Sequence, residues 1–290
     1  MIDYDPHNWS DHLFDLRGTV IKKVAPRVGW ITLWSILVLL ISIQLPVQIP
    51  PTAHLMVGVA LGLLLVFRTN ASYDRYWEGR RQWGSIVNAA RNLARSSVAW
   101  MNIETDSTRE VRLWTVSFAY ALMHRLREEH SFGDYFPKLP LGQAKECYAT
   151  KNIPLAASIQ ISRAISKARA EGTITDQEQL LMDTQVANLV DALGACDRIH
   201  RTPVPFAYVV HLRRALIIYC VTLPHVLADG FGWTTPVVAM LVSFILLGIE
   251  EIGVEIEDPF GKDDNDLPLE NFCKAIESDF CSVCQEPCEF

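Results

Sequence analysis

Four long apolar runs interrupt the polar segments of the chain, and each predicts a helix able to lie in a membrane. They span residues 30–49, 54–67, 215–228 and 233–249. The first contains no charged residue over its twenty positions. At about 1.5 Å per residue, such a helix can cross about 30 Å of hydrocarbon. Only "PPTA" separates the first two runs and only "DGFG" the last two, so the pattern predicts two transmembrane hairpins with four transmembrane helices in all.

Basic residues flank the open ends of both hairpins and are absent from the two tips. They are Arg17, Lys22, Lys23, Arg27, Arg68, Arg75, Arg80, Arg81, Arg201, Arg213 and Arg214. Because cytoplasmic loops carry an excess of Lys and Arg, this asymmetry predicts that both termini and the middle of the chain are cytoplasmic. The N-terminal stretch opens with acidic and polar residues, without the basic and then apolar order of a secretory signal.

The middle of the chain has the periodicity of helices outside a membrane. "DQEQLLMDTQVANLVDAL" places Leu180, Leu181, Val186, Leu189, Val190 and Leu193 at helical spacing, with acids and amides between them. "SFGDYFPKLPLG" is predicted to be a loop because glycine and proline punctuate it. The resulting organisation is a cytosolic N-terminal segment 1–29, a first hairpin running into a cytosolic helix 30–84, a cytosolic helical region 85–205, a second hairpin 206–256, and an acidic loop with a tail 257–290.

The stretch "VFRTNASYDRYWEGRRQWG", residues 66–84, carries its aromatic residues past the point where the apolar run ends at Arg68. It predicts one continuous helix that leaves the lipid, with the Arg68 side chain reaching water or pairing with an acid. Its aromatic side chains, Tyr73, Tyr76, Trp77 and Trp83, are predicted to pack the helix against the cytosolic helices.

Composition and motifs narrow the functional classes. The net charge of −7 argues against nucleic-acid binding, which favours basic domains. No Walker loop, dinucleotide-binding glycine pattern or G-x-S-x-G elbow is present, and "HRLREEH" lacks the spacing of H-E-x-x-H. The seven cysteines do not form a disulfide framework, since their number is odd and several are isolated. The chain is therefore predicted not to be an enzyme.

Two segments carry candidate metal ligands. Cys273, Cys281, Cys284 and Cys288 form C-x7-C-x2-C-x3-C, a spacing at which thiolates can hold zinc, although the usual second short pair is missing. The stretch 250–270 is rich in carboxylates but lacks the alternating oxygen donors and the glycine turn of an EF-hand. Spacing alone favours a solvated acidic loop there.

Three segments together resemble the bestrophin family of ion channels in its bacterial branch. They are "FRTNASYDRYWEGRRQWG", "ACDRIHRTPVPFAYVVHLRRALIIYCVTLP" and "GIEEIGVEIEDPFGKDDNDLPLE". The resemblance covers about residues 20–270 and leaves out the cysteine-bearing tail. It implies an all-α, multi-pass membrane protein that assembles as a homopentamer around one central pore and conducts ions passively.

The resemblance also implies a membrane neck lined by Val59, Leu63 and Phe67. Their i, i+4, i+8 spacing places them on one helix face. Five copies of each would form apolar rings able to gate by dewetting. Periodicity alone leaves open the alternative that the three side chains face lipid.

A second constriction of the family is an aliphatic ring in the cytosolic part. A gapless count places Gln177 there, and Ile174 is the nearby aliphatic alternative. Eukaryotic members bind calcium through the acidic stretch after D-P-F-G, where Asp263 and Asp266 match. Lys262 and Asn265 stand in place of acids, which weighs against a Ca²⁺ site. No cofactor is required, and both Ca²⁺ and Zn²⁺ are disfavoured.

The leading hypothesis is a homopentameric channel in a bacterial inner membrane, whose partners are small inorganic ions, the lipid bilayer and its own copies. Chloride is favoured as the conducted ion, and cation permeation stays open. The alternative is a membrane-anchored metal-binding or redox protein that uses the C-terminal cysteines. A third reading is a helical scaffold that does not conduct.

Overall fold

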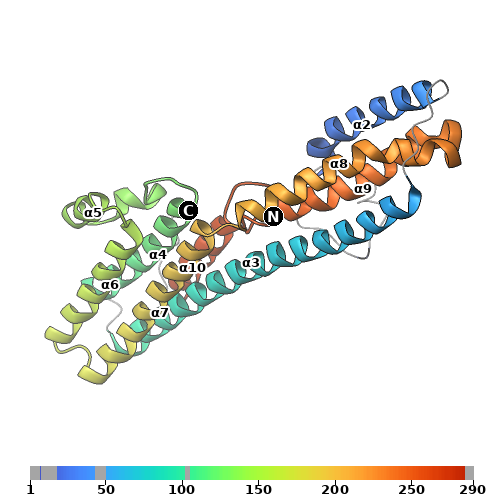
Figure 1. The fold of residues 1–290 in the computed structure, drawn as a ribbon. Coiled ribbons are helices and arrows are strands. Elements are labelled where there is room, and N and C mark those ends of the chain that lie inside the picture. The colour runs from blue at the N-terminus through green and yellow to red at the C-terminus, as the bar shows by residue number, and fades with distance from the viewer. Residues whose placement is uncertain (1–6, 8–17, 43–49, 102–104, 285–290) are drawn as a thin grey trace. The chain divides into compact units, whose positions relative to one another are not determined.

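The computed structural model describes residue 7 and residues 18–42, 50–101 and 105–284. Every regular element within these ranges is a helix (Figure 1). The chain forms two compact units. The first comprises residues up to Tyr76 together with 203–258 and 263–266, and the second comprises residues 77–202, 259–262 and those from 267 onwards.

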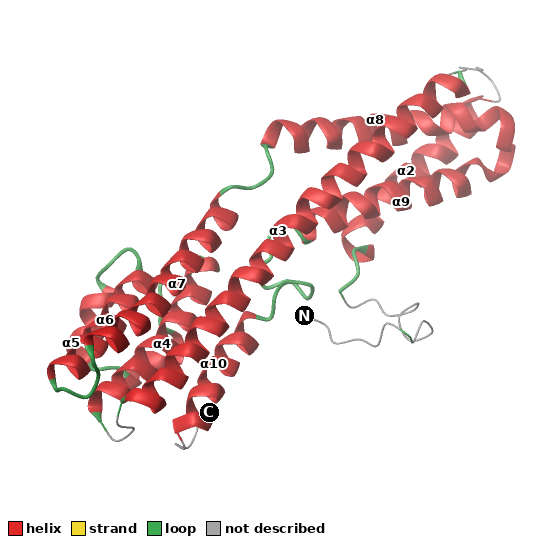
Figure 2. Ribbon diagram, turned by 90° about the horizontal axis from the view of Figure 1, so that it is seen from below, coloured by secondary structure: helices red, strands yellow, loops and turns green. Residues whose placement is uncertain are grey.

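The first unit is built from long apolar helices. They are α2 (Ile21–Ser42), the first part of α3 (Pro51–Trp100), α8 (Phe206–Phe231) and α9 (Thr235–Glu255), with the short 3-10 helix η2 (Gly232–Thr234) between the last two (Figure 2). Three helical stretches in the described part of the chain are long and apolar enough to cross a membrane, namely Ile21–Ile41, Pro51–Trp100 and Phe206–Glu255. The third stretch contains both α8 and α9.

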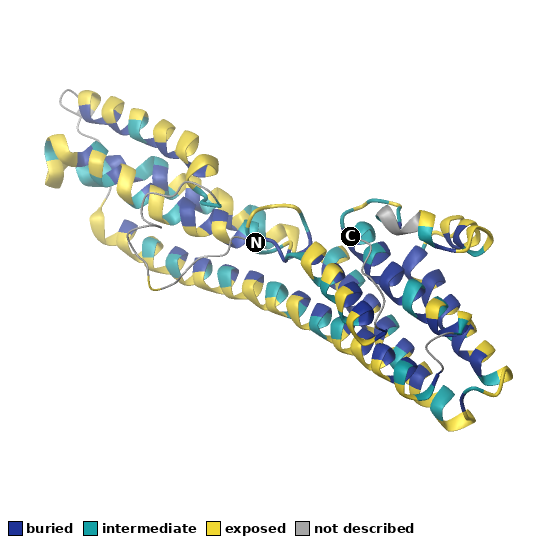
Figure 3. Cartoon of the chain, turned by 180° about the vertical axis from the view of Figure 1, so that it is seen from behind, coloured by how far each residue is buried: buried dark blue, intermediate teal, exposed yellow. Residues whose placement is uncertain are grey.

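Packing inside the first unit uses small sets of aliphatic side chains. Leu61 and Leu65 of α3 meet Leu212 and Leu216 of α8 in one buried cluster. A second cluster joins Val24 and Val28 of α2 to Leu247 of α9. Many residues of these helices are exposed (Figure 3), and a large share of them carry large apolar side chains. This distribution suits helices in lipid, where association depends on close packing and hydrogen bonds because lipid tails are as apolar as leucine.

The second unit contains the rest of α3 and a set of shorter helices. These are α4 (Asp106–Leu126), the 3-10 helix η1 (Gly133–Lys138), α5 (Leu141–Tyr148), α6 (Ile153–Ala170), α7 (Asp176–Arg201) and α10 (Leu269–Cys284). Side-chain caps start three of them. Thr105 caps α4, Asn152 caps α6, and Thr175 forms a capping box with Glu178 on α7. Such caps satisfy backbone N–H groups that have no partner within the helix.

Large buried side chains form the core of this second unit. Trp83 of α3 stacks on Phe272 of α10 at a centroid distance of 5.9 Å. Trp114 of α4 meets Phe132 edge-on at 6.1 Å. All of the apolar side chains on one face of α10 are buried as well, which is the pattern of a helix docked in a water-soluble bundle.

The continuity of α3 confirms the expectation for residues 66–84. This helix begins at Pro51 and ends at Trp100. Fifty residues at about 1.5 Å each correspond to a helix about 75 Å long, far more than a bilayer core requires. The same helix therefore belongs to both units.

Three details differ from the sequence-based expectations. Helix α2 begins at Ile21, before the uncharged run, because the lysines and arginine there continue the helix and Pro26 lies close to its start. The predicted loop "SFGDYFPKLPLG" contains η1, since a tight 3-10 turn tolerates glycine and proline. The aromatic stripe does not pack as one face: Trp83 is fully buried, whereas Tyr73 and Trp77 are more than half exposed.

We expect Phe280→Ala to destabilise the second unit by about 3–5 kcal/mol, because the large-to-small change leaves a cavity under α10. Phe280 is 1% exposed. Chemical denaturation of the purified protein, followed by tryptophan fluorescence, measures the change. Val283→Ala is the control on the same helix, since Val283 is 42% exposed and its truncation should change stability little. Equal effects of the two substitutions would contradict the docking of α10 described above.

Candidate functional site

The three predicted neck residues share one uncovered face of α3. Val59, Leu63 and Phe67 are 59%, 57% and 63% exposed in the single chain. Leu61 and Leu65, on the other side of the helix, are the residues that pack against α8. Because the described part of the chain does not cover this apolar face, we expect it to meet lipid, a second copy of the chain or a pore.

The three predicted residues do not exhaust this face. Met56 is 74% exposed and precedes Val59 by three positions, so it extends the uncovered apolar face by one helical turn. The three-residue spacing between Met56 and Val59 could have identified it from the sequence.

A buried ion pair lies directly after this apolar face. Arg68 is 1% exposed, and its Nη2 donates to the Glu257 carboxylate, whose side chain is only 16% exposed. The Nη1 atom of Arg68 donates to Ser72 Oγ at 3.1 Å. A buried guanidinium requires such partners because the charge loses its hydration. The expectation that Arg68 pairs with an acid is therefore confirmed, although the pair is buried and does not reach water.

Glu257 links this arginine to two further segments of the first unit. Its Oε1 accepts the backbone N–H of Val204, in the connection between α7 and α8, at 2.8 Å. Its backbone carbonyl accepts Arg75 Nε at 3.1 Å. One glutamate thus ties α3 to the end of α9 and the start of α8. The tie on α3 is at Arg68, the residue directly after Phe67. Spacing along the chain offered no signal for this partner.

The acidic loop after α9 is held by side chains of the same chain. Lys23 Nζ donates to Asp263 Oδ2 at 3.2 Å. Asn265 Nδ2 donates to the Gly18 carbonyl at 2.8 Å and to Glu255 Oε1 at 2.9 Å. The lysine and the asparagine amide therefore place positive charge and N–H donors where a cation would otherwise be expected among carboxylates.

Asp263 and Asp266, the two predicted metal ligands, do lie together. Asp266 Oδ2 accepts the backbone N–H of Asp263 at 2.7 Å, and Asp266 is 5% exposed. The pKa of Asp266 is raised to about 6, chiefly by burial and also by repulsion from Asp263, Asp258 and Glu255, against the lowering effect of the hydrogen bond from the Asp263 backbone. In the described part of the chain, no three Cys, His, Asp or Glu side chains gather as a metal site would require.

Three cysteines of the tail lie in the core of the second unit. Cys273, Cys281 and Cys284 are all buried on α10, and burial raises the pKa of Cys273. A buried thiol in apolar surroundings resists deprotonation, whereas zinc binds the thiolate. Cys288 lies outside the described residues.

The two candidates for the cytosolic constriction differ in exposure. Ile174 is 3% exposed and lies in the turn before α7. Gln177 is exposed in the first turn of α7. Leu180 follows Gln177 on the same helix and is 70% exposed, so it is an aliphatic candidate that the sequence count did not select.

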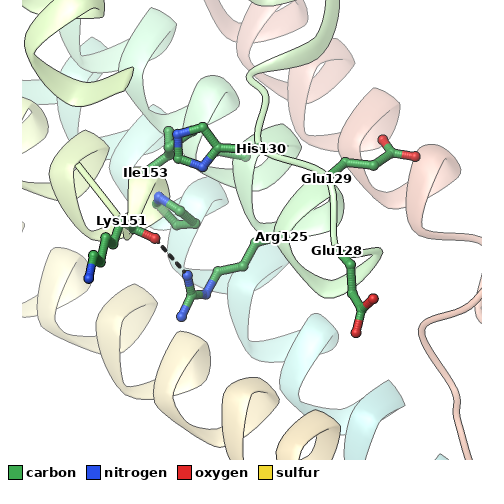
Figure 4. A pocket seen from close by; sticks show the side chains of 8 residues that line it. Arg125, Glu128, Glu129, His130, Lys151 and Ile153 are labelled. Atoms are coloured by element: carbon green, nitrogen blue, oxygen red, sulfur yellow. Dashed lines mark hydrogen bonds between the residues drawn. The ribbon is translucent and has the colours of Figure 1, made fainter. Parts of the chain in front are cut away.

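A small cleft of about 180 Å³ lies in the second unit beside the end of α4 (Figure 4). Arg125 donates to both carboxylate oxygens of Asp197, at 3.0 and 2.9 Å, and to the Lys151 carbonyl at 3.1 Å. Glu129 accepts from Lys262 Nζ at 2.6 Å and pairs with His124, and these contacts lower the pKa of Glu129 to about 2. Two charged side chains of the cleft, Arg125 and Glu129, are therefore already paired with groups of opposite charge.

The sequence and the fold of the chain are both similar to those of known proteins. The family model described as Bacterial/Fungal Bestrophin protein matches residues 1–282. The voltage-dependent anion channel-forming protein alr2987 of Nostoc sp. is 40% identical over 276 residues, which cover 93% of this chain and 89% of that protein. The voltage-dependent anion channel-forming protein sll1024 of Synechocystis sp. is 35% identical over 293 residues, covering 97% and 94%.

Solved structures show the same fold. A crystal structure of a bacterial bestrophin homolog from Klebsiella pneumoniae has a TM-score of 0.87 to this chain at 30% sequence identity. The match covers 91% of this chain and 99% of that one.

We expect Glu257→Gln to cost about 3–5 kcal/mol of stability, because the buried Arg68 charge loses its counter-charge. Glutamine keeps an oxygen that can accept the Val204 N–H, so the change isolates the charge. Denaturant titration of the purified protein measures the cost. The double variant Arg68→Met with Glu257→Gln should be more stable than Glu257→Gln alone, since no unpaired charge remains. A double variant that is equally or more destabilised would contradict this account of the pair.

Asp266→Asn should change how stability depends on pH. The folded pKa of Asp266, about 6, exceeds its ordinary value of 3.8, so the folded chain binds this proton more tightly than the unfolded chain. The stabilising contribution is present below about pH 4 and is lost as pH rises through about 6. At about 1.4 kcal/mol per pKa unit, the loss is at most about 3 kcal/mol.

Thermal unfolding between pH 4 and pH 8 tests this dependence. The asparagine variant should lack the fall in stability that the wild type shows between pH 4 and pH 6. Asp264→Asn, at an exposed position two residues earlier, is the control and should keep that fall. Parallel curves for the wild type and Asp266→Asn would rule out the raised pKa.

Proposed function

The chain belongs to the bacterial and fungal bestrophin family, and on that premise we propose that it is a passive channel for small monovalent ions, with chloride favoured, in a bacterial inner membrane. The observation that carries the proposal is the uncovered apolar face of α3. It lies on a helix long enough to cross a membrane, and it ends at a buried ion pair.

Four transmembrane helices, α2, α3, α8 and α9, form the membrane part of each subunit in this proposal, and both termini are cytoplasmic. Five subunits place their α3 helices around a central axis. Val59, Leu63 and Phe67 then form three apolar rings, with Met56 one turn before them. The next turns of the same face carry exposed Asn70, Asp74 and Trp77, so the face stops being purely apolar once the helix has passed Arg68.

Apolar rings control the passage of an ion through the water that surrounds it. A narrow ring of aliphatic and aromatic side chains offers no oxygen or nitrogen to replace the water shell, so it conducts when wet and closes by dewetting. No fixed charge in the rings selects between anions and cations. The anion preference is supported by the relatives, which carry the name voltage-dependent anion channel-forming protein. Cation permeation is an outcome that the experiment below distinguishes.

Gln177 is the residue we assign to the cytosolic constriction, in preference to Ile174. Exposure supports this choice, because a side chain that lines a pore cannot lie in the core of its own subunit. Five amide groups would make a polar ring, which is wetter than an aliphatic one and permits ions to pass with part of their hydration.

The acidic loop works without Ca²⁺ in this proposal. Hard cations bind where several oxygen ligands and net negative charge converge. Here the Lys23 ammonium already lies against Asp263, and Asn265 directs its N–H bonds into the same loop. The alternative of a metal or redox protein draws no support from Cys273, Cys281 and Cys284, which are core side chains.

Reversal potentials in planar bilayers with asymmetric NaCl test the channel and its neck together. The wild type should conduct, and a triple alanine variant of Val59, Leu63 and Phe67 should show a larger open probability or an altered chloride-to-sodium permeability ratio, since the rings lose most of their apolar surface. The matched control is the triple alanine variant of Leu33, Leu37 and Ile41 on α2, which has the same spacing and comparable exposure. That control should leave selectivity unchanged.

Three results would be decisive against parts of the proposal. Silent bilayers with correctly assembled wild type would favour a scaffold over a channel. Identical currents from the wild type and the neck variant would remove the neck assignment. A reversal potential at the sodium equilibrium value would make the channel cation-selective.

A further inference from the structure

A polar groove of about 320 Å³ lies between α3 and α7, wholly within the second unit. The two helices run side by side there (Figures 1 and 2). Ala89 and Ala192 line the groove and are buried, so its floor is made of methyl groups. Small residues at these two positions leave the hollow open, whereas the rim carries amide side chains from both helices.

The amides of the rim are joined to one another. Asn92 Nδ2 donates to Gln185 Oε1 at 3.2 Å, and Asn188 Nδ2 donates to the same oxygen at 3.4 Å. Each NH₂ group carries two hydrogens. A second N–H of Asn92 and of Asn188, and the NH₂ group of Gln185, are therefore left to donate to a ligand. Asn88 adds another amide to the lining.

The groove positions of α3 have the same helical phase as the proposed neck positions. At about 100° of rotation per residue, positions 59, 63, 67, 85, 88 and 92 of α3 fall within an arc of about 80°. Two of these positions, Asn88 and Asn92, are asparagines of the groove. By helical spacing, this phase of α3 carries apolar side chains at positions 59, 63 and 67 and amide side chains at positions 88 and 92.

We propose that this groove is a weak binding site for small inorganic anions on the cytosolic part of the ion pathway, and that Asp191 on its rim limits the anion preference. The inference rests on the proposed channel function and deepens it. Neutral N–H donors bind an anion without a fixed positive charge, so the anion can also leave, as conduction requires. Asp191 is exposed and lines the groove, and its carboxylate repels an anion held by the amides.

Removing the Asp191 charge should change the ion selectivity. Asp191→Asn should raise the chloride-to-sodium permeability ratio about two- to tenfold in 0.1 M NaCl, because it removes one negative charge per subunit from the groove. The effect should shrink in 1 M NaCl, where the Debye length falls from about 10 Å to about 3 Å. Asn188→Asp should shift the ratio in the opposite direction.

Asp183→Asn is the matched control for these currents. Asp183 lies on α7 as well, but it accepts a hydrogen bond from Ser162 Oγ of α6 at 2.5 Å and lines the neighbouring groove, which Asp191 also borders, and not the amide groove. The substitution makes the same charge change and keeps an acceptor oxygen. Equal shifts from Asp183→Asn and Asp191→Asn would assign the effect to the overall charge of the unit and overturn the groove.

A second experiment tests anion binding at the site directly and needs no current measurement. Crystals of the full-length Asp191→Asn protein grown in sodium bromide should show anomalous scattering from bromide at the amide nitrogens of Asn92 and Gln185. The double variant Asn92→Leu with Asn188→Leu should lose it. No bromide in the groove overturns the site even if the protein conducts. Bromide in the groove of a protein that does not conduct supports the site and removes the proposed channel.

Discussion

The burial of Arg68 is the constraint on which the first unit depends. A guanidinium directly after an apolar helix run cannot be buried alone. Removing a single charge from water costs more free energy than the packing of its side chain contributes. Glu257 neutralises it, and the same carboxylate accepts the Val204 N–H while its backbone binds Arg75. The partner charge comes from beyond α9, so the pair forms only when the second hairpin has packed against α3.

Helix α3 then serves two roles through two faces. Leu61 and Leu65 bind α8 and hold the helix in its unit. The opposite face keeps Val59, Leu63 and Phe67 uncovered. A single helix can do both because its residues rotate by about 100° per position, so packing and a free surface need not compete for the same side chains. In the proposed channel, this separation allows α3 to hold the subunit together with one face and to line the pore with the other.

Several other charges in the described part of the chain have partners of opposite charge or hydrogen-bond donors beside them. Lys23 and Asn265 hold the acidic loop, and Lys262 pairs with Glu129 in the second unit. The loop is therefore divided between the two units, with residues 259–262 in one and 263–266 in the other. Asp191 stands apart from such pairs in our proposal, where it acts on the permeating ion.

The sequence by itself determined the features that depend on local patterning. Apolar run length and basic flanks predicted the two hairpins, helical periodicity predicted α7 and the continuous α3, and the i, i+4, i+8 spacing placed Val59, Leu63 and Phe67 on one face. Only the tertiary structure decided which side chains are buried and which charges meet. It buried Ile174 and Trp83, left Tyr73 and Trp77 exposed, and paired Arg68 with Glu257. Periodicity is set by the geometry of one helix, whereas burial and ion pairing depend on contacts between segments far apart in the chain, which no local pattern encodes.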